Sequence, residues 1–226
     1  MLRERPSPNI SEFLRYLASH DESEDKLPSL NDLSRELNIS LASLREQLEV
    51  ARALGLVEIK PRTGMRRKPY SFVPAVKQSL DYAIAMNRDH FIAFADLRQN
   101  IELAYWHKAV KLLTSEDRAY LGDLVARAWE KLRGSPIEIP HSEHRELHLT
   151  IYRRLDNPFV SGLLQSYWDA YEAVGLNFFT DYNYLTQVWN YHQQMVDAIC
   201  NNDAEAGYKA LSEHTDLIHH LISSSK

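Results

Sequence analysis

Several residue types and patterns are scarce in this sequence, and each scarcity excludes a class of protein. Cys200 is the only cysteine among 226 residues, so an internal disulfide is excluded. The 7 glycines are too few for an architecture of many short strands joined by glycine-rich turns. No run approaches about 18 consecutive apolar residues, so we expect no membrane span. The starting segment MLRERPSPNI lacks the apolar core of a signal peptide, and together these absences favour a cytoplasmic protein.

The sequence also lacks an overall basic excess, because its formal net charge is −5. The charge is unevenly distributed: residues 1–70 carry 12 Lys and Arg against 11 Asp and Glu, whereas the remainder carries 14 against 20. One short basic segment, opposed only by Glu58, contains Lys60, Arg62, Arg66, Arg67 and Lys68. An acidic body with one basic segment is typical of a protein that contacts phosphate groups at one end. A solvated basic loop is the alternative for so short a run.

The first 55 residues show three stretches of helical periodicity. Residues 11–19 form the first, and a second begins after Ser29, a residue type that caps helix N-termini well. Asn38 interrupts the pattern, since Asn tolerates the left-handed conformation that tight turns need. Ser40 then caps a third helix, which we expect to end at Gly55.

A basic hairpin is expected directly after the third helix. Residues 56–59 indicate a strand, residues 60–64 have the composition of a turn, and residues 69–72 are the expected return strand. Helix, helix, tight turn, helix and two-stranded wing together predict a winged helix-turn-helix DNA-binding domain over residues 1–72. A three-helix packing unit with a spare hairpin is the alternative.

In a helix-turn-helix, the second helix of the pair offers its N-terminal residues to base edges in the major groove. Here those residues are Ser40, Leu41, Ala42, Ser43 and Arg45. A basic hairpin beside that helix can reach phosphates or the adjacent minor groove.

From residue 73 to residue 226 we expect helices almost throughout. Seven are predicted, near residues 74–87, 90–113, 115–133, 140–156, 158–178, 184–201 and 203–222. Ser115 is the expected N-cap of the third of these helices. Because the connections between them are short, the predicted arrangement is an antiparallel bundle of about six to seven helices, and the fold class is mainly α.

Four of the ten histidines occupy positions that suggest a metal site. His144 and His148 are four residues apart on one predicted helix, so they project from the same face. His192 and His214 lie on two later helices, and a bundle can direct such side chains into a shared interior. Imidazole nitrogen suits zinc, nickel, copper or iron. A single helical His is more often a surface or core residue, and His141 lies on nearly the same face as His144.

Two parts of the sequence resemble a known family of regulators. The segment LPSLNDLSRELNISLASLREQLEVARALGLVEIKPRTG resembles the winged helix-turn-helix of GntR-type regulators. The segment HRELHLTIYRRLDNP, and the later stretch from His192 through NDAEA to His214, resemble the FCD (FadR C-terminal domain) effector domain of one GntR subfamily. The resemblance implies a ligand-responsive transcriptional regulator, and not an enzyme.

The resemblance also implies roles for individual residues. The metal ligands, for a divalent transition metal with zinc or nickel favoured, would be His144, His148, His192 and His214. Arg98 would lie near the effector pocket, although a simple ion pair with Glu102 is the alternative. The family's usual Arg is absent at Asn31 and Leu41, which puts the usual operator sequence in doubt. The DNA contacts that remain available are Ser40, Ala42, Ser43, Arg45, Lys60, Arg62, Thr63 and Gly64.

The expected mechanism is a homodimer that recognises a palindromic double-stranded DNA operator and responds to a small carboxylate. The family usually has Asp where this chain has His144, so four neutral imidazoles would leave the metal its full charge and favour an anionic ligand. One alternative is a metal-sensing regulator. Another alternative is a metal-dependent hydrolase domain fused to a DNA-binding module. Such a hydrolase would need a general base near the metal, but Glu143 and Glu146 project from other faces of the predicted helix than His144 and His148.

Overall fold

The computed structural model describes residues 10–19, 26–60, 64–175 and 181–223. The chain divides into two compact units, Met1–Gln78 and Ser79–Lys226. We describe each unit by itself. The division falls inside helix α4 (Val73–Met86), so that helix contributes residues to both units.

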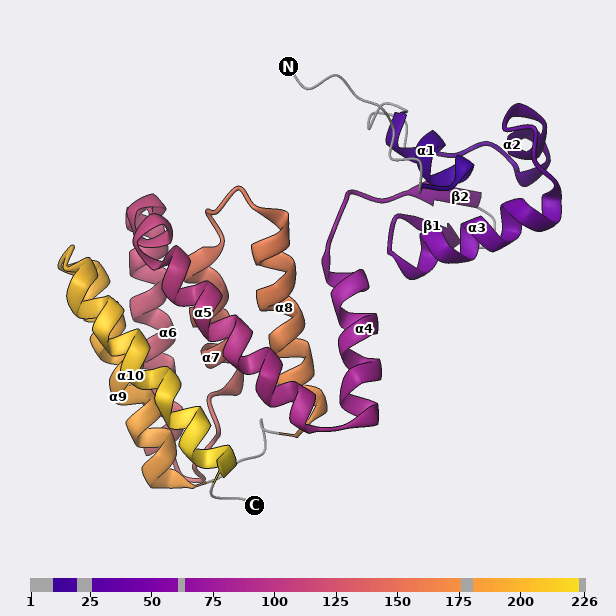
Figure 1. The fold of residues 1–226 in the computed structure, drawn as a ribbon. Coiled ribbons are helices and arrows are strands. Elements are labelled where there is room, and N and C mark those ends of the chain that lie inside the picture. Colours follow the sequence, from indigo (N-terminus) through magenta and orange to yellow (C-terminus); the bar gives the residue numbers. More distant parts are fainter. Residues whose placement is uncertain (1–9, 20–25, 61–63, 176–180, 224–226) are drawn as a thin grey trace. The chain divides into compact units, whose positions relative to one another are not determined.

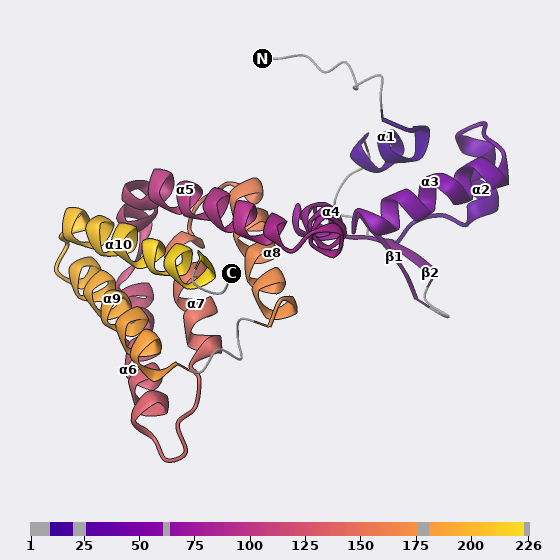
Figure 2. The same cartoon turned by 60° about the horizontal axis from the view of Figure 1, so that its bottom comes forward.

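In its described residues, the first unit contains three complete helices, the start of α4 and a two-stranded antiparallel hairpin (Figures 1 and 2). Its elements are α1 (Glu12–Ser19), α2 (Leu30–Glu36), α3 (Leu41–Ala53), β1 (Val57–Lys60) and β2 (Gly64–Arg67). Phe13, Leu33 and Leu44, one from each helix, are completely buried in its core. The core also includes Val57 and Met65, so the hairpin packs on the helices through one face.

Local chemistry explains where these helices begin and end. The hydroxyl of Ser29 accepts the backbone N–H of Asp32, and that of Ser40 accepts the N–H of Ser43. Asn38 adopts a left-handed φ of 53° in the turn between α2 and α3, and Gly55 adopts a φ of 70° after α3. The predicted helix-turn-helix boundaries are therefore confirmed.

The return strand of the hairpin differs from the prediction. It is β2, Gly64–Arg67, and the expected strand at residues 69–72 is wrong. Val57 pairs with Arg67 and Lys60 pairs with Gly64, which places Met65 toward the core between two exposed neighbours. The last ladder bond runs from the N–H of Lys68 to Leu56, because Pro69 has no N–H to continue it.

The second unit is an antiparallel helical bundle (Figure 1). With the end of α4, its helices are α5 (Asp89–Leu112), α6 (Ser115–Arg133), α7 (His141–Tyr152), α8 (Pro158–Ala173), α9 (Tyr182–Cys200) and α10 (Ala204–Ser223). Trp106, Leu124 and Leu147, from three different helices, are almost completely buried at its centre. The predicted mainly helical fold, with a bundle of about seven helices, is confirmed.

Several helix ends depart from the sequence expectation. The N-cap of α6 is Thr114 rather than Ser115, because Thr114 and Asp117 exchange side-chain to backbone hydrogen bonds as a capping box. Helix α7 ends at Tyr152 rather than near residue 156. Helix α8 ends at Ala173, with Gly175 at a φ of 83°, and of the helix expected to residue 178 only residues 176–178 lie outside the described residues.

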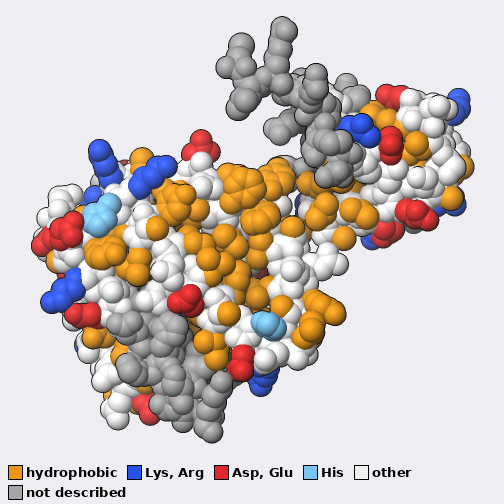
Figure 3. Space-filling view, viewed as in Figure 1, with side chains coloured by type: hydrophobic (Ala, Val, Ile, Leu, Met, Phe, Trp, Pro, Cys, Tyr) orange, Lys and Arg blue, Asp and Glu red, His pale blue; other side chains and the backbone are white. Residues whose placement is uncertain are grey.

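The surface of the second unit is mixed in character. On the face seen in Figure 3, hydrophobic side chains gather over α5, and charged side chains of both signs lie toward the edges of the unit. Leu97 of α5 is 45% exposed, and Tyr82 and Met86 of α4 are 70% and 68% exposed. Within the described residues, every helix is too short or too polar to cross a bilayer.

We expect Gly207 to be required for the packing of α10 on α5. A Cβ atom at this position would lie 2.5 Å from Cζ2 of Trp106. Trp106 is completely buried, and its indole N–H donates to the carbonyl of Ala204 at 2.8 Å, so the ring cannot move aside cheaply. Gly207→Ala should lower the free energy of unfolding by about 1–3 kcal/mol, measured by chemical denaturation.

Gly122 on α6 is the matched control, because a Cβ there would meet nothing within 4 Å. Gly122→Ala should raise the free energy of unfolding by about 0.5–1 kcal/mol through helix propensity alone. Equal effects of the two substitutions would contradict the role given to the contact with Trp106.

Candidate metal centre

The four histidines singled out in the sequence meet inside the second unit. His144 and His148 come from α7, His192 from α9 and His214 from α10. The last three are completely inaccessible, and His144 is 8% exposed. One candidate ligand nitrogen from each residue lies within 4.8 Å of all the others. Three helices therefore bring four imidazoles to one point in the bundle core.

The geometry of the cluster fits a shared cation. Nε2 of His148 and Nε2 of His192 are 3.0 Å apart. A metal held at about 2.1 Å by two imidazoles keeps their nitrogens roughly 3.0–3.4 Å apart. The ring centroids of His192 and His214 are 4.4 Å apart, and those of His144 and His192 are 4.6 Å apart.

Several nitrogens of the cluster have no hydrogen-bond partner among the described residues. They are Nε2 of His144, Nδ1 of His192 and both ring nitrogens of His214. A buried polar atom without a partner costs free energy, so a set of them within one cluster needs an explanation. Ligation of a metal ion through nitrogen would satisfy one nitrogen on each ring, and the donor set is one that zinc or nickel accepts.

Burial keeps these rings in the protonation state that binds metal. Burial lowers the pKa of His144, His192 and His214 well below the ordinary value of 6.5, and repulsion from neighbouring histidines acts in the same direction. Burial also lowers the pKa of His148, although the Glu102 carboxylate acts in the opposite direction. Neutral imidazoles offer the lone pairs that a metal needs.

A buried ion pair on α5 supports the cluster. Oε1 of Glu102 lies 3.2 Å from Nδ1 of His148, and Oε2 lies 2.9 Å from Nη2 of Arg98. Burial opposes ionisation of Glu102, but Arg98 and His148 outweigh it and hold the pKa of Glu102 below its ordinary value. A carboxylate on the far nitrogen of a metal-binding His orients the ring. From the sequence, Glu102 was considered only as a possible ion-pair partner of Arg98. Its contact with the His148 ring was therefore not predicted.

The sequence offered two interpretations of Arg98, a position near the effector pocket and an ion pair with Glu102. In the structure Arg98 lies against the histidine cluster and is also paired with Glu102. It is 2% exposed, and Nη2 is 2.8 Å from Nδ1 of His148. Its guanidinium carbon lies 4.8 Å from the ring centroid of Tyr167 and 5.5 Å from that of Trp168. Its predicted contact with an effector stays a prediction.

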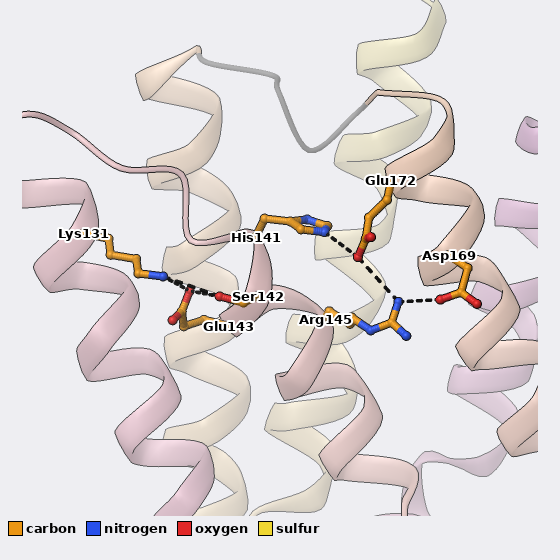
Figure 4. A network of polar contacts seen from close by, with 7 residues as sticks. All are labelled: Lys131, His141, Ser142, Glu143, Arg145, Asp169 and Glu172. Atoms are coloured by element: carbon orange, nitrogen blue, oxygen red, sulfur yellow. Dashed lines mark hydrogen bonds and ion pairs between the residues drawn. The ribbon is translucent and has the colours of Figure 1, made fainter.

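His141 lies outside the cluster. Its Nε2 is 3.0 Å from Oε1 of Glu172 on α8 (Figure 4). Its ring stacks on that of Tyr171. In the same network Arg145 contacts Asp169 at 2.9 Å, and Lys131 on α6 contacts Glu143 at 2.9 Å. Of the two histidines near the start of α7, the geometry therefore favours His144 as a ligand.

The predicted DNA contacts lie on the first unit. Ser40, Ala42 and Arg45 are exposed at the start of α3, and Ser43 is partly exposed. Lys60 and Gly64 are exposed in the hairpin, where Lys60 also pairs with Glu58 at 2.8 Å. Arg62 and Thr63 lie outside the described residues.

Comparison with known proteins places this architecture among transcriptional regulators. Residues 93–217, more than half of the chain, match the family model of the FCD domain. The HTH-type transcriptional regulator YieP of Escherichia coli is 27% identical over 197 residues, which cover 81% of this chain and 80% of that protein. The HTH-type transcriptional regulator YcbG of Bacillus subtilis is 23% identical over 198 residues, covering 88% and 81% respectively.

Solved structures share the fold. A GntR protein of Streptococcus agalactiae superposes with a TM-score of 0.63 at 16% identity, covering 92% of this chain and 95% of that chain. McbR/YncC of E. coli superposes with a TM-score of 0.53 at 17% identity, covering 89% of each chain. The relatives are transcriptional regulators rather than enzymes. The chain therefore belongs to the GntR family of helix-turn-helix transcriptional regulators and carries an FCD domain as its C-terminal part.

Proposed function

We propose that this DNA-binding regulator senses a small carboxylate at a divalent transition metal, zinc or nickel, held by His144, His148, His192 and His214. The observation that carries the proposal is the convergence of four buried, neutral imidazoles in the FCD domain. When bound, the metal would supply an open, positively charged coordination position in an otherwise apolar interior.

The charges around the cluster support an anionic effector. Four neutral imidazoles cancel none of the charge of a divalent ion, and the ligand group contains no carboxylate. Arg98 adds a guanidinium group next to His148, although Glu102 balances its charge. Uncompensated charge in a buried site is costly, so an anion is the expected occupant of the open position.

We further propose that two copies bind one palindromic operator. One recognition helix reads only a few base pairs, and a two-fold dimer matches two half-sites. In each copy, Ser40, Ala42 and Arg45 would face the major groove, with Lys60 and the hairpin on the adjacent backbone. The exposed apolar side chains of Tyr82, Met86 and Leu97 are candidates for the surface between two copies.

A metal-sensing regulator is the second candidate, because the same four nitrogens would serve it. In that case the metal alone would change the affinity for DNA. A hydrolase receives less support, because Glu143, a carboxylate beside the predicted ligands in sequence, is held by Lys131 at 2.9 Å.

We expect metal binding to depend on the clustered histidines. His148→Ala and His192→Ala should each reduce bound transition metal from about one ion per chain to below about a tenth, measured by elemental analysis of purified protein. The control is His107→Ala, because His107 is exposed and pairs with Glu205 at 2.9 Å. Helical circular dichroism separates loss of metal from loss of fold. An unmodified protein purified without any transition metal, and unable to take one up, rejects the site.

Arg45 should contribute to DNA affinity in a way that Arg52 does not. Both are exposed on α3, but Arg45 lies in its first turns and Arg52 lies at its end, paired with Glu49 at 2.8 Å. Arg45→Ala should weaken operator binding by about 5- to 100-fold, whereas Arg52→Ala should change it by less than about twofold. Fluorescence anisotropy on DNA selected from a random pool measures both, and equal effects would contradict the proposed orientation.

The carboxylate response is tested on the same DNA at constant metal concentration. Small organic acids should change operator affinity at least about fivefold in the metal-loaded protein, and not in His148→Ala. If metal alone changes the affinity and no acid does, the chain is a metal sensor and the carboxylate proposal is wrong.

A further inference from the structure

A group of buried hydrogen-bond donors without partners lies next to the histidine cluster. Within the part of the chain that the structure describes, Nε of Arg98, the hydroxyl of Tyr167 and Nε1 of Trp168 are buried without a hydrogen-bond partner. Arg98 lies over the rings of Tyr167 and Trp168, and the Trp168 ring centroid is 4.6 Å from that of His144. These three side chains and the histidines therefore form one continuous polar group inside an apolar bundle.

Each of these three groups lacks an acceptor rather than a donor. A guanidinium N–H and an indole N–H can only donate, and a phenol in such surroundings can do so as well. Leaving them unsatisfied costs free energy, so an occupant rich in acceptor oxygens fits them. A carboxylate is the acceptor that guanidinium groups bind best.

The position of the proton on the His148 ring affects the hydrogen bonds of Arg98. Its Nδ1 lies 2.8 Å from Nη2 of Arg98 and 3.2 Å from Oε1 of Glu102, and it cannot accept from Arg98 while donating to Glu102. A ring that ligates through Nε2 carries its proton on Nδ1, so Glu102 receives that hydrogen bond. Nη2 of Arg98 then keeps Glu102 as its partner, and Nε of Arg98 is the guanidinium donor left for a ligand.

The charge count leads to the same kind of occupant. The ion pair of Arg98 and Glu102 is neutral as a pair, and imidazoles that bind a metal do so in their neutral form. The site with a divalent ion thus carries two uncompensated positive charges. One carboxylate would leave one of them, and two carboxylates would cancel both.

We propose that the effector is a dianion, a dicarboxylic acid with one carboxylate at the metal and the other at the donors of Arg98, Trp168 and Tyr167. This inference rests on the proposed function, because it assumes that the four histidines hold a divalent metal. It assigns to Trp168 and Tyr167 the selection of the second carboxylate.

Matched pairs of acids test the proposal on the unmodified, metal-loaded protein. The probes are succinate with butyrate, glutarate with valerate, and malate with 2-hydroxybutyrate, so each pair differs by the second carboxylate. Binding is measured by calorimetry, and metal content is measured in parallel. The dicarboxylate of at least one pair should bind about tenfold or more tightly than its partner.

Two substitutions at one position isolate the charge. His144→Asp adds one negative charge to the site, and His144→Asn is its uncharged counterpart of the same shape. His144→Asp should bring the dicarboxylate preference close to parity, whereas His144→Asn should keep it, both with metal bound. Trp168→Phe removes the indole N–H together with part of the ring, keeps an aromatic side chain, and should weaken the dicarboxylate about three- to tenfold more than the monocarboxylate.

The outcomes separate this inference from the proposed function. If the protein binds metal and binds monocarboxylates tightly, or shows no preference for the dicarboxylate in any pair, the dianion proposal is wrong. The proposal of a carboxylate sensor is then unaffected. Retention of the preference in metal-loaded His144→Asp overturns the charge argument. A protein without metal, or one that binds none of the six acids, counts against the proposed function itself.

Discussion

Burial of four imidazoles at one point is the constraint on which the second unit is built. Each ring loses its hydration in the bundle core, and repulsion among the rings disfavours protonation. The rings therefore remain neutral, and several of their nitrogens lack a hydrogen-bond partner within the described residues. A packed arrangement of that kind is costly by itself, and a bound cation is the physical reason that would offset the cost.

The helices around the cluster are held in the register that this convergence requires. Gly207 lets α10 approach Trp106 of α5, and His214 lies two turns further along α10. About two turns and one turn before Trp106, respectively, Arg98 and Glu102 of the same α5 reach His148. The contact that packs α10 and the ion pair that orients the ring thus depend on a single helix, so core packing and site geometry are linked.

The two units have separate cores, which suits separate tasks. The first unit closes its core with Phe13, Leu33 and Leu44 and leaves the start of α3 exposed. The second encloses the histidines within its own helices. Regulation requires that the effector bind differently to the states that do and do not bind DNA. Helix α4 is continuous across the division between the units and is the element that joins them covalently.

The sequence alone determined what depends on short-range chemistry. The caps at Ser29 and Ser40, the turn at Asn38 and the four-residue spacing of His144 and His148 were evident because they involve neighbours in the chain. Tertiary packing decided the remaining features. The burial of Met65 fixes the register of the hairpin, Glu102 contacts Nδ1 of His148, and His141 contacts Glu172 instead of joining the cluster. No sequence pattern predicted that the donors of Trp168 and Tyr167 lie beside Arg98. Their position depends on how each helix is rotated within the bundle, and that rotation depends on all packing contacts together.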